Sequence, residues 1–179
     1  ADGAIVEWHD MAQFHVLGQR LDSNGAPLWN PNGVVLWGGT LSAGDSLIAD
    51  GTGGAYVTHG RYSLAVRHLA ADGTLDWNGD SLIITRQIAY APPVATAPST
   101  PSIGDNADLL LSWSEIGPAP DYIRQIRAQK VTRDGTLAWG DSGAVVSRGP
   151  GDRFYPAIVS DGGGGALMAW GDLRNGVDW

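Results

Sequence analysis

Short segments that alternate apolar and polar residues recur along the chain, and each runs into an Asn-Gly or Asp-Gly pair. The three segments are 14–21, 63–69 and 123–131, and the pairs that follow them are Asn24-Gly25, Asp72-Gly73 and Asp134-Gly135. Alternation with a period of two residues places the apolar side chains on one face of a strand. An Asn-Gly or Asp-Gly pair favours a tight turn, because glycine readily adopts positive φ values. The pattern therefore predicts, three times over, a strand that enters a tight turn.

Further short apolar segments surround these turns. A tryptophan lies four residues after each glycine of the pair, at Trp29, Trp77 and Trp139. A second strand type is predicted at 4–8, 55–59, 109–113 and 166–170, and a third at 34–36, 82–84 and 144–146. No stretch shows sustained helical periodicity. Each unit thus holds about four short strands.

The units recur at intervals of about 50 to 60 residues, a period typical of solenoids and propellers. We predict an all-β fold, a β-propeller built of four-stranded antiparallel blades, of which about three to four are present. Residues 1–179 form one segment, with repeats at approximately 1–49, 50–104 and 105–160 and a partial repeat at 161–179. Because propellers have ~4–8 blades, we expect part of a longer ring. A four-bladed ring and a ring assembled from two chains are the alternatives.

Composition narrows the classes of partner. The 26 glycines and 10 prolines leave little room for helices, and cysteine is absent, so disulfides play no part. The net charge of −8 argues against binding to nucleic acid, whose phosphates attract positive surfaces. No apolar run approaches the ~20 residues that span a bilayer, so we expect no direct membrane insertion.

Residues 155–174 carry a longer pattern: Pro-x-aliphatic, then Asp-Gly-x-Gly-Gly, a strand ending in Trp, and Asp-x-Arg. This resembles a repeat found in exported bacterial proteins, which continues with Gln-Arg-Leu and an Asn-Gly-x-x-x-Trp turn, matched here at 19–21 and 24–29. The resemblance implies a β-propeller-like array in a secreted or surface-attached protein, periplasmic or extracellular, and carries no catalytic residues. Residues 132–139 are distantly similar to the Asp-box of sialidase-type propellers, which is a structural turn.

Catalytic chemistry has few candidates. Glycoside hydrolysis usually requires two carboxylates across a sugar site, and the chain has two glutamates, Glu7 and Glu115. The aspartates that precede glycine are interpreted as turn residues: Asp50, Asp72, Asp134 and Asp161. Three substrate-binding arginines of the sialidase kind cannot be assigned. We therefore assign no catalytic residue.

Binding candidates come from residues outside the repeated pattern. Trp37 is expected to be an exposed aromatic that contacts sugar or protein. The segment 89–101 is interpreted as a proline-rich insertion and 117–122 as a lengthened hairpin, both suited to recognition. The binding candidates are Trp37, Tyr90, Pro92, Pro93, Pro98, Pro120 and Tyr122. The four histidines lack zinc spacing, and calcium has one candidate site at Asp105, Asn106 and Asp108; no other cofactor is expected.

These observations favour a non-catalytic binding or scaffold module of an exported or surface-attached protein, as an accessory subunit of a larger assembly. Its partner would be another protein or other chains of that assembly, with carbohydrate as a further candidate. Two alternatives remain: a carbohydrate-active propeller enzyme and a purely structural spacer. Carboxylates that converge in one cleft would favour the enzyme, and the absence of a well-formed pocket would favour the spacer.

Overall fold

The computed structural model describes residues 3–39, 46–60, 63–79, 81–85, 94–96, 108–117, 119–120 and 122–175. These residues form antiparallel strands, together with a short 3₁₀ turn, η1 (Trp77–Gly79). The prediction of an all-β fold is therefore confirmed. The described strands form four successive sheets of two to four strands rather than a closed ring.

Each sheet is a meander, in which strands that follow one another in sequence pair with one another. The first sheet contains β1 (Gly3–Asp10), β2 (His15–Asp22) and β3 (Val34–Gly38), and the second contains β4 (Ser46–Ala49), β5 (Ala55–Gly60), β6 (Leu64–Leu69) and β7 (Leu82–Thr85). The third contains β8 (Val94–Thr96), β9 (Leu109–Ile116), β10 (Arg124–Val131) and β11 (Ala144–Ser147), and the fourth contains β12 (Arg153–Ser160) and β13 (Ala166–Asp172).

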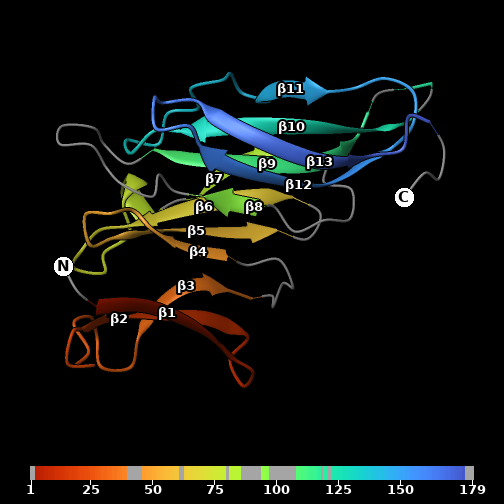
Figure 1. The fold of residues 1–179 in the computed structure, drawn as a ribbon. Coiled ribbons are helices and arrows are strands. Elements are labelled where there is room, and N and C mark those ends of the chain that lie inside the picture. Colours follow the sequence, from red (N-terminus) through yellow and green to blue (C-terminus); the bar gives the residue numbers. More distant parts are fainter. Residues whose placement is uncertain are drawn as a thin grey trace.

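The sheets are layered in chain order, with the first sheet at the bottom of Figure 1 and the third and fourth at the top. β1 contacts β4, β4 contacts β8, and β12 contacts both β8 and β9. The first strand of each sheet therefore lies beside the first strand of the next. This arrangement places the cores between neighbouring sheets.

Three apolar clusters fill the spaces between the sheets. Val16 and Leu36 of the first sheet meet Val57 of the second, and Tyr56 of the second meets Leu111 of the third. A smaller cluster joins the third sheet to Ile158 of the fourth. Neighbouring residues of β5 thus serve two different cores, because successive side chains of a strand point to opposite faces. β5 and β9 are therefore buried on both faces, whereas β1 and β13 are half-exposed.

The strands predicted from alternation are present, and three others were missed. The missed strands are those that begin the second, third and fourth sheets, β4, β8 and β12. The segment 89–101 was interpreted as a proline-rich insertion that forms a loop, and β8 corrects this for residues 94–96, which pair with β9 as a strand. The edge of β9 offers backbone donors and acceptors that pair with any extended segment, so a side-chain pattern was not needed to form this strand.

The three Asn-Gly and Asp-Gly pairs form the same turn. In each, the glycine N–H donates to the carbonyl three residues earlier, and a second bond encloses the turn: Asp22 N to Ala26 O, Ala70 N to Thr74 O, and Thr132 N to Thr136 O. The glycine φ values lie between 80° and 86°. This is a type I turn followed by a left-handed residue, a conformation that favours glycine.

Aspartate side chains stabilise the turns, as the sequence predicted. One carboxylate oxygen of Asp50 accepts the N–H groups of residues 52 and 54, and one oxygen of Asp161 accepts those of residues 163 and 165. Asp72 and Asp134 likewise accept a backbone N–H two residues later. All four are therefore turn residues.

Tryptophan joins each of the first two turns to the turn of the next sheet. The Trp29 indole N–H donates to the Ala71 carbonyl, and the Trp77 N–H donates to the Arg133 carbonyl, at 3.0 Å in both cases. Each ring also lies against the glycine of the next turn, Gly73 or Gly135. We call this pairing the tryptophan–turn contact. It fixes the position of one sheet relative to the next.

His68 is buried on β6 between two carboxylates. Its Nδ1 lies 2.6 Å from Asp76 Oδ2, and its Nε2 lies 3.0 Å from Asp50 Oδ2. Burial by itself would raise the pKa of Asp50, but the hydrogen bonds from His68 and Thr52 outweigh burial and hold that pKa well below 3.8. This network links the turn before β5 to the turn after β6.

We expect Asp50→Asn to lower the free energy of unfolding by about 3 kcal/mol at pH 7, because it removes a charged acceptor from a buried network. The folded-state pKa of Asp50 lies well below the unfolded value of 3.8, so this stabilisation is fully present above pH 3.8 and is lost progressively as the pH falls from 3.8 through the folded-state pKa. Urea unfolding at pH 7 and pH 3 measures the difference, which should narrow at pH 3. Asp161→Asn is the control, in an equivalent exposed turn without histidine, and should cost at most about 1 kcal/mol. Equal losses for the two variants would contradict the assigned role of His68.

Gly73→Ala and Gly25→Ala test the tryptophan–turn contact. Both residues lie at the same left-handed position, so each alanine should cost about 1 kcal/mol through the backbone. A Cβ at Gly73 would lie 2.7 Å from the Trp29 ring, whereas a Cβ at Gly25 meets nothing within 4 Å. We therefore expect a further loss of about 1–3 kcal/mol for Gly73→Ala alone, measured by urea unfolding. Similar stabilities for the two variants would show that the ring does not restrict this position.

Candidate functional site

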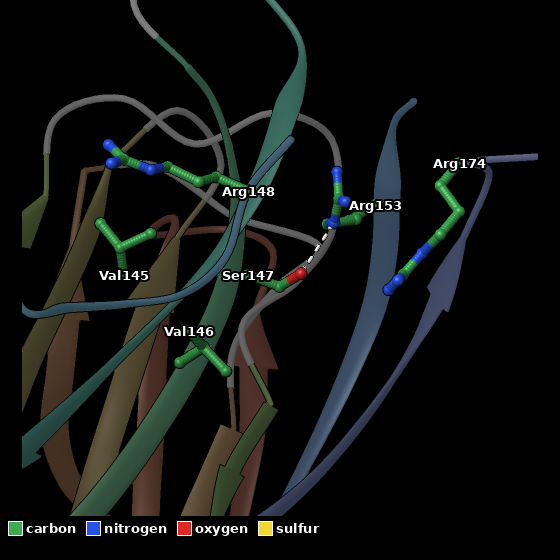
Figure 2. A pocket seen from close by; sticks show the side chains of 6 residues that line it. All are labelled: Val145, Val146, Ser147, Arg148, Arg153 and Arg174. Carbon is green, nitrogen blue, oxygen red and sulfur yellow. Dashed lines mark hydrogen bonds between the residues drawn. The ribbon is translucent and has the colours of Figure 1, made fainter. Parts of the chain in front are cut away.

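A cleft of about 600 Å³ opens beside the third and fourth sheets. Figure 2 shows its lining, which comes from β11, from the loop between β11 and β12, from the first residue of β12 and from the residues after β13. The residues are Val145, Val146, Ser147, Arg148, Arg153 and Arg174. We call this site the arginine cleft.

Arg153 forms the structural base of the cleft. Its side chain is only 3% exposed. Its Nη1 donates to the carbonyls of Gly149 and Gly151, at 3.0 and 2.7 Å, and its Nε donates to Ser147 Oγ at 2.7 Å. A Cβ at Gly151 would lie 2.4 Å from a backbone oxygen, so this residue must be glycine. The 148–152 loop therefore wraps closely around the Arg153 guanidinium.

Arg174 is the accessible arginine on the opposite wall, with a side chain 56% exposed. Its Nη2 and Nε lie 2.5 and 2.9 Å from Asp172 Oδ2, and these bonds lower the pKa of Asp172 to about 2. In Figure 2 the Arg174 side chain points toward β12 and Arg153. Only one carboxylate oxygen of Asp172 holds this guanidinium.

Arg148 is exposed and extends away from the other two arginines in Figure 2. Within the described ranges its guanidinium has no hydrogen-bond or ionic partner. Three arginines thus line the cleft, and two of them, Arg153 and Arg174, lie at the carboxylate of Asp172, in a chain whose net charge is −8. The planar guanidinium group of arginine and the hydroxyl of serine can both donate hydrogen bonds to a carboxylate or a phosphate group.

The glutamates proposed for the enzyme alternative do not meet. Glu7 lies on β1 and Glu115 on β9, and the second sheet lies between their two sheets. Glu115 is buried and accepts hydrogen bonds from Trp113 Nε1 at 3.0 Å and from Gln125 Nε2 at 2.8 Å. Its Oε1 also lies 2.5 Å from Arg127 Nε. Glu115 therefore belongs to a buried structural network.

Trp37 is 9% exposed, so its expected exposure is wrong. Its ring stacks on His59 with a centroid distance of 4.8 Å, and the Arg67 guanidinium lies 4.2 Å from the ring centroid. β3 carries Trp37 opposite Val16 of β2, and the second sheet covers this face. Trp37, which lies outside the repeated sequence pattern, is thus part of the interface between the first and second sheets.

The other predicted site residues fall into two groups. Pro120 and Tyr122 are exposed in the connection from β9 to β10, and Arg124, which follows, donates its N–H to Asp152 beside the cleft. Pro120 and Tyr122 themselves do not line the arginine cleft. Tyr90, Pro92, Pro93, Pro98, Asp105 and Asn106 lie outside the described residues.

The remaining calcium candidate, Asp108, forms an ion pair with Lys130 at 2.9 Å. Across the described ranges, no group of three or more His, Cys, Asp or Glu side chains is arranged to hold a metal ion. Calcium binding at this segment stays a prediction.

Sequence reasoning did not bring the three cleft arginines together. Arg174 belongs to the Asp-x-Arg pattern, but Arg148 and Arg153 lie in a loop and at a strand end that no repeated pattern marks. A surplus of arginine over residues 148–174 was the only signal that could have been used. Chain folding alone brings the ends of β11 and β13 to the same cleft.

Within the part of the chain that the structure describes, no helix is long and apolar enough to cross a membrane. No protein-family model, curated protein or solved structure matches this chain.

Proposed function

We propose that this chain is a non-catalytic binding module, and that the arginine cleft holds an anionic group of its ligand. The observation that carries the proposal is the concentration of Arg148, Arg153 and Arg174 around one cleft of an acidic chain. Arg153 is fixed by the 148–152 loop, so it offers a positive field at no cost in side-chain entropy. Arg148 and Arg174 are accessible and would supply the direct contacts.

The geometry favours binding over the two alternatives. Glu7 and Glu115 lie on separate sheets, and Glu115 is held by three neighbouring side chains, which argues against a glycosidase pair. The presence of a cleft with charged walls argues against a purely structural spacer. A carboxylate-bearing sugar is one ligand of the proposed chemistry, and an acidic group on a protein partner is another.

We also propose that the four sheets are blades of a β-propeller that serves as a rigid scaffold. The successive contacts from β1 to β4, from β4 to β8 and from β8 to β12 support this arrangement, since the innermost strands of propeller blades neighbour one another. The resemblance of residues 155–174 to repeats of exported bacterial proteins supports an exported or surface-attached location. In such a protein the module would serve as an accessory subunit of a larger assembly.

Glucuronate and inorganic phosphate are suitable probes, because they separate carboxylate from phosphate recognition. We expect Arg174→Ala and Arg148→Ala each to weaken binding about tenfold or more, since a hydrogen bond to a charged group contributes roughly 1.5–3 kcal/mol. Calorimetric titration at low ionic strength measures the affinity, which should fall as salt is added. Arg133→Ala removes an arginine outside the cleft and should leave the affinity unchanged. If neither anion binds, or if Arg133→Ala weakens binding as much as the cleft variants, the proposal is wrong.

The affinity for glucuronate should stay constant between pH 5 and pH 8. Asp172 has a pKa of about 2 and remains ionised throughout this range, and arginine stays protonated. The described lining contains no histidine. Titrations at pH 5, 6, 7 and 8 test this expectation. A change of more than about threefold would indicate a titrating group that the cleft as described does not contain.

A further inference from the structure

Asp172, the last residue of β13, places a carboxylate beside two of the cleft arginines. The antiparallel register pairs it with Arg153, the first residue of β12. Asp172 Oδ2 lies 2.5 and 2.9 Å from Nη2 and Nε of Arg174, and 3.5 Å from Nε of Arg153. The Asp172 side chain is 16% exposed. One oxygen atom of the protein thus faces two guanidinium groups at the site proposed to hold an anion.

The negative charge of Asp172 is fixed in this position. The hydrogen bond from the Arg174 side chain lowers the pKa of Asp172 to about 2, so the carboxylate is ionised at neutral pH. Its Oδ1 accepts the backbone N–H of Arg174 at 2.9 Å, and this bond holds the carboxylate close to its own chain. An anionic ligand in the cleft therefore meets a negative charge that neither protonates nor leaves.

Asp172 also occupies hydrogen-bond donors that a ligand would use. A guanidinium has five N–H groups, and a pair on one edge can hold two oxygens of a carboxylate or a phosphate. In Arg174 the edge formed by Nε and Nη2 donates to Asp172 Oδ2. In Arg153 the Nε donates to Ser147 Oγ, and Nη1 donates to carbonyls of the 148–152 loop. The two arginines nearest Asp172 thus offer a ligand only part of their donors.

We propose that Asp172 is a specificity-determining residue of the arginine cleft, and that its carboxylate shifts the preference of the cleft from doubly charged phosphates toward singly charged carboxylates, such as those of acidic sugars. This inference deepens the proposed function and rests on it. Electrostatic repulsion is proportional to the product of the two charges, so the repulsion from Asp172 is twice as large for a doubly charged ligand. A phosphate ester also has three terminal oxygens that accept hydrogen bonds, whereas a carboxylate has two and needs fewer donors.

A purely structural role for Asp172 predicts the opposite result. If the carboxylate only held Arg174 in place, its removal would release the arginine and weaken the binding of every anion. Arg174 is 56% exposed, and an ion pair at such an exposed position contributes little to the order of a side chain. Repulsion instead predicts stronger binding without the charge of Asp172, by a factor that increases with the charge of the ligand.

Three related sugars separate the charge of the ligand from its shape: glucuronate, glucose 6-sulfate and glucose 6-phosphate. The first two carry a single negative charge. The phosphate ester carries almost two at pH 8, because its second pKa is about 6. The sulfate and phosphate esters have the same tetrahedral shape, so a difference between them reports charge alone.

We expect Asp172→Asn to bind glucuronate and glucose 6-sulfate about fivefold more tightly than the wild type in calorimetric titrations at pH 8 and low ionic strength. Binding of glucose 6-phosphate should strengthen about 25-fold, the square of this gain, because the repulsion energy doubles. Asparagine keeps an oxygen that can accept the Arg174 N–H. Asp161→Asn is the matched control, because it changes the net charge equally at the opposite end of the β12–β13 pair. It should leave all three affinities unchanged.

Circular dichroism establishes that each variant is folded, and Asp172→Ser, whose hydroxyl can accept the same N–H, carries the test if the asparagine variant is not. Equal or weaker binding of glucose 6-phosphate by Asp172→Asn would overturn the inference, as would equal gains for the phosphate and the sulfate. Wild-type binding that Arg174→Ala weakens would then leave the proposed function intact. If neither the wild type nor Asp172→Asn binds any of the three sugars, the inference and the proposed function are both wrong.

Discussion

The contact between a tryptophan and the glycine turn of the next sheet is the constraint on which the arrangement of the sheets depends. A hairpin turn alone positions only its own strands. The indole adds a flat apolar ring that fits over a residue without a side chain, and an N–H that reaches a specific carbonyl. Because the turn glycine already needs a positive φ, one residue satisfies both the turn and the packing.

The same arrangement explains which surfaces are buried. Sheets held in register by these contacts enclose apolar side chains between them, so the two central sheets are covered on both faces and the outer ones on one. Polar groups enter the interior only with partners. His68 lies between Asp50 and Asp76, and Glu115 between Trp113, Gln125 and Arg127. Each of these networks joins different segments of one sheet, which is consistent with a structural role.

The surfaces available for recognition lie where this regular packing ends. At one end of the third and fourth sheets, the 148–152 loop and the residues after β13 gather three arginines, two of which share the carboxylate of Asp172. A rigid layered scaffold with specific groups at its ends is suited to bind partners without rearrangement.

The sequence by itself determined the local structure. Period-two alternation, glycine at the third turn position and aspartate before glycine act over a few residues, so the strands and turns follow from them without knowledge of the rest of the chain. The strands β4, β8 and β12 could not be found in this way, because they form by pairing with a neighbour that the sequence does not identify. Tertiary structure alone decided that Trp37 is buried, that Glu115 is held by hydrogen bonds in the interior, and that Arg148, Arg153 and Arg174 line the same cleft. These features depend on which sheet faces lie opposite one another, and such contacts join residues whose separation along the chain carries no local signal.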